Sequence, residues 1–412
     1  MNKLKGACLF GQSGGPTSVI NSSALGVLET ALGEDCITAV YGCAHGIKGI
    51  LNDCLYDISQ EDKKELSLLR YTPSSALGSC RYKLKDSSVD DTDYKRILEI
   101  FQKYNIRYFF YNGGNDSMDT CNKVSKYLMS QGYECRIMGV PKTIDNDLSG
   151  TDHCPGFGSA AKYIATSCME IYQDANVYDT GTVVIVEIMG RNAGWLTAAS
   201  ALASHMGGGP DLIYLPEQPF DLEAAMAQIK EVYDKRNNCL VALSEGIMDK
   251  NGKFIAEYGQ DVATDAFGHK QMGGAGAFVA NEVKSRFGYK VRSIELSLLQ
   301  RCAAHSASLT DIEEAYQAGK TAVELAVSGV TDKMVAFERK EGAEYQLEMK
   351  PVPLDIVANT EKKMPTEWIK PDHTGLTDDF IAYALPLIQG ETQLPYENGL
   401  PRFARLKKVL AK

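Results

Sequence analysis

The sequence has no excess of basic residues. Its 412 residues include 43 Lys and Arg against 53 Asp and Glu, which gives a formal net charge of −10. A nucleic-acid backbone needs a net basic face to neutralise its phosphates, so this balance argues against a nucleic-acid partner. A small anionic substrate is still compatible with it, because a few local Arg and Lys residues are enough to bind one.

Paired cysteines are also missing. Eleven Cys occur, an odd number, and none of them forms a C-x-x-C pair. The spacing therefore predicts neither a disulfide framework nor a zinc site. Several Cys stand inside apolar runs, as Cys8 and Cys239 do, which is typical of buried, reduced thiols in a cytoplasmic protein.

No segment has the composition of a signal peptide or a membrane span. The N-terminal apolar stretch ends in Gly-rich sequence by Gly11 and is too short for a signal peptide. The uncharged run over residues 192–210 approaches spanning length, but it contains Asn, Thr, Ser, His and four Gly. We expect a loop and a buried helix there, in a soluble cytoplasmic protein without a membrane partner.

What the sequence does contain is a recurring order of apolar run, Gly-rich or charged turn, and helical stretch. Continuous apolar runs of this length predict parallel strands that are buried on both faces. Five such runs cover residues 5–10, 106–111, 136–140, 182–188 and 240–243. Strands that alternate with helices predict an α/β fold, in which ligands bind beyond the carboxyl ends of the strands. All five turns lie at those ends.

Two short motifs are misleading. Residues 318–321, Ala-Gly-Lys-Thr, look like the end of a P-loop, but the earlier Gly of that motif is missing. We interpret residues 311–328 as an amphipathic helix, like residues 117–129 and 222–233. Residues 156–161 match a loose dinucleotide fingerprint without a preceding strand, and predict only a helix start that needs small residues.

Chain length predicts two or three domains, at roughly 100–200 residues each. No low-complexity linker or clear repeat marks a boundary between them. Residues 249–276 are rich in Gly and polar residues and predict a loop insertion.

The most informative stretch is residues 143–147, Thr-Ile-Asp-Asn-Asp, just after a predicted strand. Asp145 and Asp147 are two residues apart, so one carboxylate can act as a base while the other helps to hold a metal or orient a phosphate. Taken alone, the stretch is equally consistent with a turn whose Asx side chains bond to their own backbone.

Four motifs occur in order along the chain. They are Gly-Gly-x-Asp-Ser at 113–117, Pro-Lys-Thr-Ile-Asp-Asn-Asp at 141–147, Met-Gly-Arg-Asn-Ala-Gly-Trp at 189–195 and Ser-Glu-Gly at 244–246. In this order they resemble the phosphofructokinase family, and specifically its pyrophosphate-dependent branch. The resemblance runs from the first Gly loop to about residue 329.

The resemblance implies two similar three-layer α/β domains with mainly parallel sheets. Residues 1–155 with about 300–350 would bind the phosphoryl donor, and residues 156–299 with about 351–412 would bind the sugar phosphate. It further implies Mg²⁺ as cofactor, a role in glycolysis, and a homodimer or homotetramer in which a neighbouring subunit completes the site.

The implied reaction is the reversible transfer of a phosphoryl group from pyrophosphate to the 1-hydroxyl of fructose 6-phosphate, which gives fructose 1,6-bisphosphate and phosphate. Asp145 would take the hydroxyl proton, while Thr143 and Asp147 would steady the transferring group and the metal. Phosphoryl transfer needs positioned charges more than covalent help from the protein. The implied donor site comprises Gly14, Arg81, Asn115 and Asp116, and the implied sugar-phosphate site comprises Met189, Gly190, Arg191 and Glu245.

The family binds the 6-phosphate with an Arg followed nine residues later by Arg in a Gln-Arg pair. Arg292 and Arg301 keep this spacing, so we place the site on them. Residues 267–274 imitate a related motif, but Met272 replaces its Arg, and we interpret residues 263–276 as an insertion in which Lys270 is still a candidate for reaching substrate.

The sequence departs from the family pattern at three further positions. Asn115 replaces an Asp, and since a neutral amide is a weaker Mg²⁺ ligand than a carboxylate, the metal ligands Asn115 and Asp116 stay open. Leu298 replaces the usual His or Tyr, and Thr182 stands where the family has an Arg that crosses between subunits.

Two residues indicate the donor. ATP-using relatives carry Gly where this chain has Asp116, whose bulk and charge would repel the α-phosphate of a nucleotide. They also usually carry Gly at the position of Lys142. The ammonium of Lys142 can bind the leaving phosphate of pyrophosphate. Both positions favour pyrophosphate over ATP.

Three alternatives remain at this point. The first is the same fold with ATP as donor, and the second is a non-catalytic regulatory subunit, which the intact Asp145, Asp147, Arg191 and Glu245 argue against. The third is a dinucleotide-dependent oxidoreductase, which leaves the Asp pair unexplained.

Overall fold

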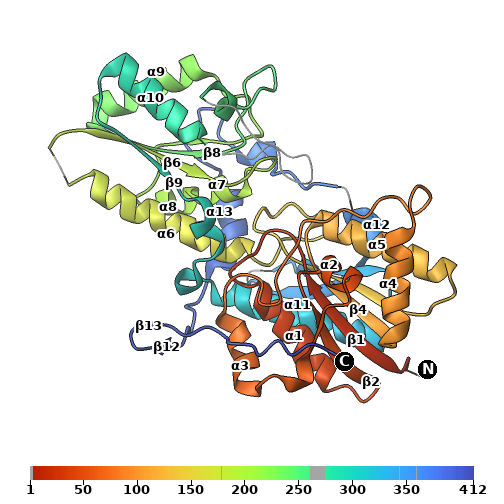
Figure 1. The fold of residues 1–412 in the computed structure, drawn as a ribbon. Helices are drawn as coiled ribbons and strands as arrows, with labels where there is room; N and C mark the ends of the chain where they lie inside the picture. Colours follow the sequence, from red (N-terminus) through yellow and green to blue (C-terminus); the bar gives the residue numbers. More distant parts are fainter. Residues whose placement is uncertain (1–2, 178, 260–273, 343, 359) are drawn as a thin grey trace.

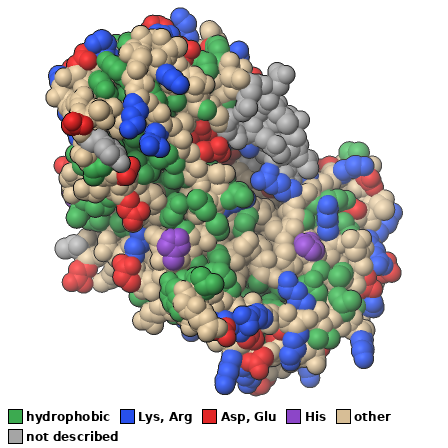
Figure 2. All heavy atoms as spheres, turned by 60° about the vertical axis from the view of Figure 1, so that its left-hand side comes forward, with side chains coloured by type: hydrophobic (Ala, Val, Ile, Leu, Met, Phe, Trp, Pro, Cys, Tyr) green, Lys and Arg blue, Asp and Glu red, His purple; other side chains and the backbone are tan. Residues whose placement is uncertain are grey.

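The chain folds into two units, each built around one sheet with helices on both faces (Figure 1). The computed structural model describes residues 3–177, 179–259, 274–342, 344–358 and 360–412. No helix in these ranges is long and apolar enough to cross a membrane. Acidic and basic side chains are interspersed over the face drawn in Figure 2.

The first unit contains a seven-stranded sheet. Its central pairs are parallel, and an antiparallel strand closes each edge. In spatial order the strands are β11 (Leu347–Pro353), β10 (Lys333–Arg339), β5 (Arg136–Pro141), β4 (Ile106–Gly113), β1 (Gly6–Gln12), β2 (Ile37–Cys43) and β3 (Leu55–Asp57). The main helices are α1 (Ile20–Leu32), α2 (Ile47–Leu51), α3 (Lys63–Ser67), α4 (Thr92–Lys103), α5 (Asn115–Ser130), α11 (Leu309–Val327) and α12 (Leu354–Val357).

The second unit contains a four-stranded parallel sheet. Its strands, in spatial order, are β7 (Leu212–Tyr214), β8 (Asn238–Ser244), β6 (Thr182–Ile188) and β9 (Val291–Glu295). The covering helices are α6 (Phe157–Ala175), α7 (Trp195–Ala199), α8 (Ala201–His205), α9 (Leu222–Arg236), α10 (Ala275–Phe287) and α13 (Asp378–Ala384). The predicted α/β fold with two three-layer units and mainly parallel sheets is confirmed.

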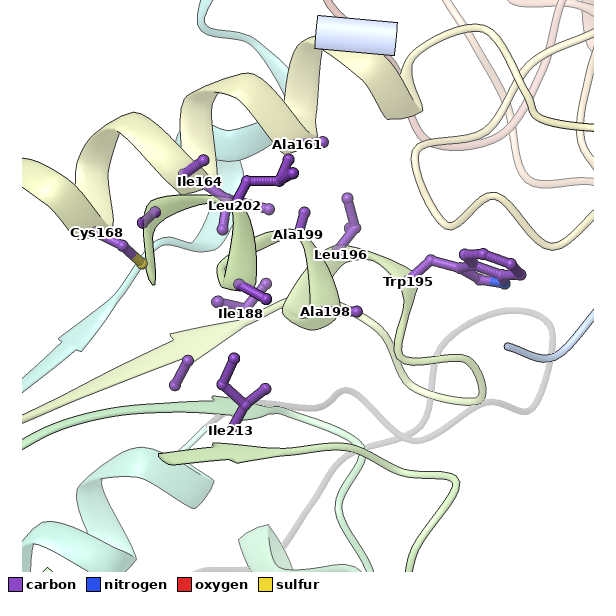
Figure 3. Close-up of a cluster of buried hydrophobic side chains, with 14 of the residues drawn as sticks. Ala161, Ile164, Cys168, Ile188, Trp195, Leu196, Ala198, Ala199, Leu202 and Ile213 are labelled. Atoms are coloured by element: carbon purple, nitrogen blue, oxygen red, sulfur yellow. The ribbon is translucent and has the colours of Figure 1, made fainter. Parts of the chain in front are cut away.

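Neighbouring residues of the central strands pack into cores on opposite faces of each sheet. In β4, Tyr108 and Phe110 face α1 and α11, whereas Phe109 and Tyr111 face α4 and α5. Such strands have no polar face, which is why their sequences are continuously apolar. In the second unit, α6, α7 and α8 cover one face of the sheet, as the cluster around Leu196 and Ile188 shows (Figure 3).

The uncharged run over residues 192–210 holds two short buried helices, α7 and α8, rather than the single predicted helix. The expected strands and helices otherwise occur within a few residues of their predicted ends. In the predicted insertion over residues 249–276, the short 3₁₀ helix Ile255–Tyr258 precedes residues that lie outside the described ranges.

The end of the chain returns to the first unit. Val409 O accepts the N–H of Asp57 on edge strand β3 (2.8 Å), and the Glu61 carboxylate accepts the N–H of Lys407 (2.7 Å). The expectation grouped residues 351–412 with the second unit, whereas residues 402–411 make these contacts with the first, where an edge strand offers unpaired backbone groups. Which unit binds which substrate stays a prediction.

The two misleading motifs have structural explanations. Gly319, in the stretch that resembles a P-loop, lies inside α11 where the helix touches α1, and a Cβ on it would lie 2.1 Å from Ser23 O. Gly156 precedes α6, and the Asp311 carboxylate accepts the N–H groups of Gly156 (2.9 Å) and Ser159 (2.8 Å). A buried carboxylate of the protein therefore occupies the helix start that resembles a dinucleotide site.

We predict that Gly319→Ala lowers the free energy of unfolding by about 1–3 kcal/mol, because the added methyl group overpacks the contact between α1 and α11. Gly33→Ala is the matched control at the end of α1, where φ is −89° and the nearest atom to a Cβ is 3.5 Å away. Urea unfolding of both variants checks this, and an equal effect of the two would contradict the proposed reason for Gly319.

Candidate active site

The carboxyl ends of strands from both sheets border a single cavity of about 260 Å³. The loops after β1, β4, β5, β6 and β8 all contribute to its wall. Most of the predicted site residues line it: Gly14, Arg81, Asn115, Asp116, Lys142, Thr143, Asp145, Asp147, Met189, Arg191, Glu245 and Arg301. The turns that the sequence indicated therefore meet in one place, as the rule for parallel sheets predicts.

A glycine loop forms one wall. Gly14 has a φ of +76°, which favours glycine, and its carbonyl accepts a hydrogen bond from Ser79 Oγ (2.7 Å). The Gly14 N–H in turn donates to Cys80 O (3.2 Å), so the segment that carries Arg81 is tied to this loop. Without side chains, Gly14 and Gly15 leave room for charged groups, since a Cβ on Gly15 would lie 3.2 Å from Arg301 Nη1.

Lys142 is a buried cation under this loop. Its side chain is 3% exposed, and Nζ donates to Gly15 O at 2.7 Å. Burial lowers the pKa of Lys142 to about 8, partly offset by the nearby carboxylates of Asp145 and Asp147. The ammonium is therefore charged at neutral pH but close to losing its proton.

The two aspartates of the Thr-Ile-Asp-Asn-Asp stretch face the same cavity. Thr143 Oγ1 donates weakly to the Asp145 carboxylate (3.4 Å) and accepts the Asp145 N–H (3.1 Å). Burial raises the pKa of Asp145, against the attraction of Lys142 and other cations. Burial and the charge of Asp145 raise the pKa of Asp147 to about 7. The arrangement is more than a self-bonded turn, because these carboxylates line a cavity that also contains cations.

The opposite wall comes from the second unit. Gly190 has a φ of +137°; its carbonyl accepts from Ser244 Oγ (2.5 Å) and its N–H donates to Glu245 Oε1 (3.4 Å). Burial raises the pKa of Glu245 to about 7. Arg191 Nε is buried and has no hydrogen-bond partner in the described part of the chain, so it is available to a bound anion.

The wall at the start of α5 carries Asn115 and Asp116. Asn115 Oδ1 accepts the Asp116 N–H (2.7 Å). The carboxylate of Asp116 is the charged group on this wall of the cavity. Among the described residues, no group of three or more His, Cys, Asp or Glu is arranged to hold a metal ion.

Arg292 does not line the cavity. It lies on β9 with its side chain exposed, although Arg301, nine residues later, reaches the cavity wall. Thr182 is 5% exposed at the start of β6 and bonds to Lys290 O (3.3 Å), while Leu298 is exposed beside Arg301. Lys270 and Met272 lie outside the described residues.

Glu361 also lines the cavity and was not predicted. Its carboxylate accepts a hydrogen bond from Asn192 Nδ2 (2.8 Å), next to Arg191. Glu361 lies in a polar stretch with no strand or motif before it, so no sequence pattern indicates this position. It reaches the cavity because the following backbone is tied to the aspartate loop, where the Lys362 N–H donates to Asp147 O (2.7 Å).

Comparison with known proteins identifies relatives over the whole chain. A model of the phosphofructokinase family matches residues 8–326. A pyrophosphate–fructose 6-phosphate 1-phosphotransferase from Halomonas elongata is 47% identical over 97% of this chain and 96% of its own length. One of the same name from Xanthomonas campestris is 46% identical over 98% and 97%. The structure of a pyrophosphate-dependent phosphofructokinase from Nitrosospira multiformis superposes with a TM-score of 0.89, at 42% identity and 98% coverage of both chains.

We predict that the cavity binds pyrophosphate more weakly as the pH rises through about 8, because Lys142 then loses its charge. Lys142→Met, whose side chain cannot titrate, is the reference. Protonation of pyrophosphate itself affects both proteins equally and drops out of the ratio of their affinities. At pH 7 the native protein should bind about 10–100 times more tightly than this variant, the equivalent of one charged hydrogen bond. Binding of the anion itself raises the pKa of Lys142, so by pH 9.5 calorimetry should find a ratio of about fourfold or less, and a constant ratio would be contrary to the lowered pKa.

Proposed function

Because the chain belongs to the phosphofructokinase family, we propose that it transfers a phosphoryl group from pyrophosphate to the 1-hydroxyl of fructose 6-phosphate. The products are fructose 1,6-bisphosphate and phosphate, and the reaction is reversible. The observation that carries this proposal is the single cavity in which Lys142, Asp116 and Asp145 meet. Names of relatives that are 46–47% identical over nearly the whole chain support the same reaction.

Asp145 is the proposed base. Burial raises its pKa and makes it a stronger base than an exposed Asp, while the nearby Lys142 and Arg191 favour its ionised form. It takes the proton of the 1-hydroxyl as that oxygen bonds to phosphorus, and the bond to the leaving phosphate breaks. In the reverse direction the protonated carboxyl group returns the proton. Thr143 and Asp147 steady this loop and the transferring group.

Lys142 and Arg81 are the proposed ligands of the donor. Both line the cavity beside the glycine loop, whose Gly14 lets the backbone approach an anion closely. The buried ammonium of Lys142 offsets the charge that develops on the leaving phosphate, and a preorganised charge of this kind costs no reorganisation during the reaction.

The sugar phosphate is assigned to the wall from the second unit. The buried Nε of Arg191 supports contact with an anion, so Arg191 holds the sugar phosphate together with Met189 and Gly190, and Glu245 faces its hydroxyl groups. Arg301 lies between this wall and Gly15, where it binds the 6-phosphate while its charge also acts on the donor loop.

Arg292 is proposed to reach the sugar phosphate from a second copy of the chain. It is exposed on β9, the edge strand of the second sheet, and the segment after this strand carries Leu298 and Leu299, which are 55% and 59% exposed. Exposed apolar residues beside an active site favour cover by another chain. A homodimer or homotetramer follows, and a mass of one chain by light scattering would be contrary to it.

Mg²⁺ is the proposed cofactor, with Asp116 and Asn115 as its protein ligands. Oxygen ligands suit this ion, which is usually held by one or two carboxylates together with substrate phosphates. When bound, it would neutralise charge on the phosphates. Chelation should abolish turnover, and added Mg²⁺ should restore it. All eleven cysteines are free thiols, which supports the cytoplasm, the compartment of glycolysis, as the location.

Asp116 is the proposed reason that ATP is excluded, and we predict that Asp116→Gly raises the ratio of kcat/KM for ATP to kcat/KM for pyrophosphate by at least about tenfold, since the loss of a metal ligand affects both donors. Like charges that meet in a site cost several kcal/mol, and about 1.4 kcal/mol is tenfold. Asp116→Asn keeps most of the bulk and loses the charge, so it separates the two effects. Coupled assays of fructose 6-phosphate with each donor measure both variants and the native protein.

The native protein is expected to use pyrophosphate and to show little activity with ATP. Strong native activity with ATP and none with pyrophosphate would reverse the donor assignment, while membership of the family would stand. An equal ratio of ATP to pyrophosphate activity in the native protein and in Asp116→Gly would remove Asp116 from donor selection.

A further inference from the structure

The loop that carries the two catalytic aspartates forms hydrogen bonds, on the side away from the cavity, with residues from the C-terminal part of the chain. Asn146 lies between Asp145 and Asp147, is fully buried and has a φ of +56°. Its Oδ1 accepts the Cys154 N–H (2.9 Å), and its Nδ2 donates to Tyr383 Oη (2.8 Å). Both ends of the amide are therefore bonded, and neither bond goes to a group of the cavity.

Tyr383 joins two points of the same loop through one hydroxyl group. Oη accepts from Asn146 and donates to Asp152 O (2.8 Å). The ring is itself fixed, because the rings of Trp195 and Trp368 lie 5.3 and 5.5 Å away and the guanidinium of Arg339 lies 4.9 Å above it. A hydroxyl on an immobilised ring is a defined anchor for a loop.

Lys362 provides a second anchor. Its N–H donates to Asp147 O (2.7 Å), and its Nζ donates to Asp152 O (2.6 Å). Trp195, at the edge of the core of the second unit, donates its indole N–H to Lys362 O (3.0 Å) (Figure 3). Both anchors thus connect the aspartate loop, which follows a strand of the first sheet, to the second unit.

These anchors lie beyond residue 326, where the match to the phosphofructokinase model ends. We propose that Tyr383, acting through Asn146, is a positioning residue that sets the orientation of Asp145 and Asp147 for phosphoryl transfer. The inference rests on the proposed function, since it presumes that these carboxylates do the chemistry. A base misplaced by a fraction of an ångström loses rate in the reacting complex more than it loses substrate affinity.

Tyr383→Phe tests this, because it removes the hydroxyl and keeps the ring. We expect kcat to fall at least about tenfold while KM for both substrates changes less than about twofold. Tyr133→Phe is the matched control: its hydroxyl also bonds to backbone carbonyls, those of Phe101 (2.9 Å) and Ile106 (2.8 Å), and it does not line the cavity. The control should lose a similar amount of stability and keep its kcat.

A second variant, Asn146→Gly, preserves the positive φ and removes the amide. If Tyr383 acts through Asn146, adding Tyr383→Phe to Asn146→Gly should lower kcat much less than it does in the native protein. All proteins are assayed with whichever donor, pyrophosphate or ATP, the native protein uses, so the outcome for Tyr383 does not depend on the donor assignment. An unchanged kcat in Tyr383→Phe, or a loss of kcat equal to that of the control, would overturn the proposal.

Discussion

The contact of a buried lysine ammonium with the glycine loop above it is the interaction on which the candidate active site depends. Lys142 lies under Gly14 and Gly15, where a Cβ would lie only 3.3 Å from Lys142 Nζ or 3.2 Å from Arg301 Nη1. Burial brings its pKa down to about 8, and it stays charged at neutral pH because Asp145 and Asp147 face it. Those carboxylates have raised pKa values for the same reason of burial. The buried positive and negative charges thus stabilise one another, and a bound phosphate would add negative charge beside Lys142, Arg81 and Arg301.

The two parallel sheets explain how so many charges reach one cavity. In each sheet the carboxyl ends of the parallel strands, and the loops after them, lie together, and those of both sheets border the same cavity. The first sheet supplies the glycine loop, Lys142 and the aspartates, while the second supplies Arg191 and Glu245. The loop after β5 connects the two units, because it follows a strand of the first sheet while Asn146 and Asp147 form hydrogen bonds with Tyr383 and Lys362, respectively.

The sequence predicted the parts of this arrangement that depend on local pattern. The strand at residues 182–188 was found at its observed ends, since residues buried on both faces of a sheet are mostly apolar. The turns after the strands could be placed because parallel sheets put them together. Glu361 could not be placed, because its position depends on tertiary contacts that no spacing encodes, such as the bonds of Lys362 to Asp147 and Trp195. Arg292 was placed by motif spacing, which does not say from which copy of the chain a side chain acts.

The most direct test of the account is to follow phosphorus during turnover. In ³¹P NMR, native protein with fructose 6-phosphate, pyrophosphate and Mg²⁺ should produce the 1-phosphate signal of fructose 1,6-bisphosphate and free phosphate in equal amounts. Asp145→Asn should give almost none of either, a loss of about 10²–10⁴-fold, while it still binds fructose 6-phosphate. Phosphate released without formation of the sugar bisphosphate, or rapid turnover by Asp145→Asn, would contradict the account.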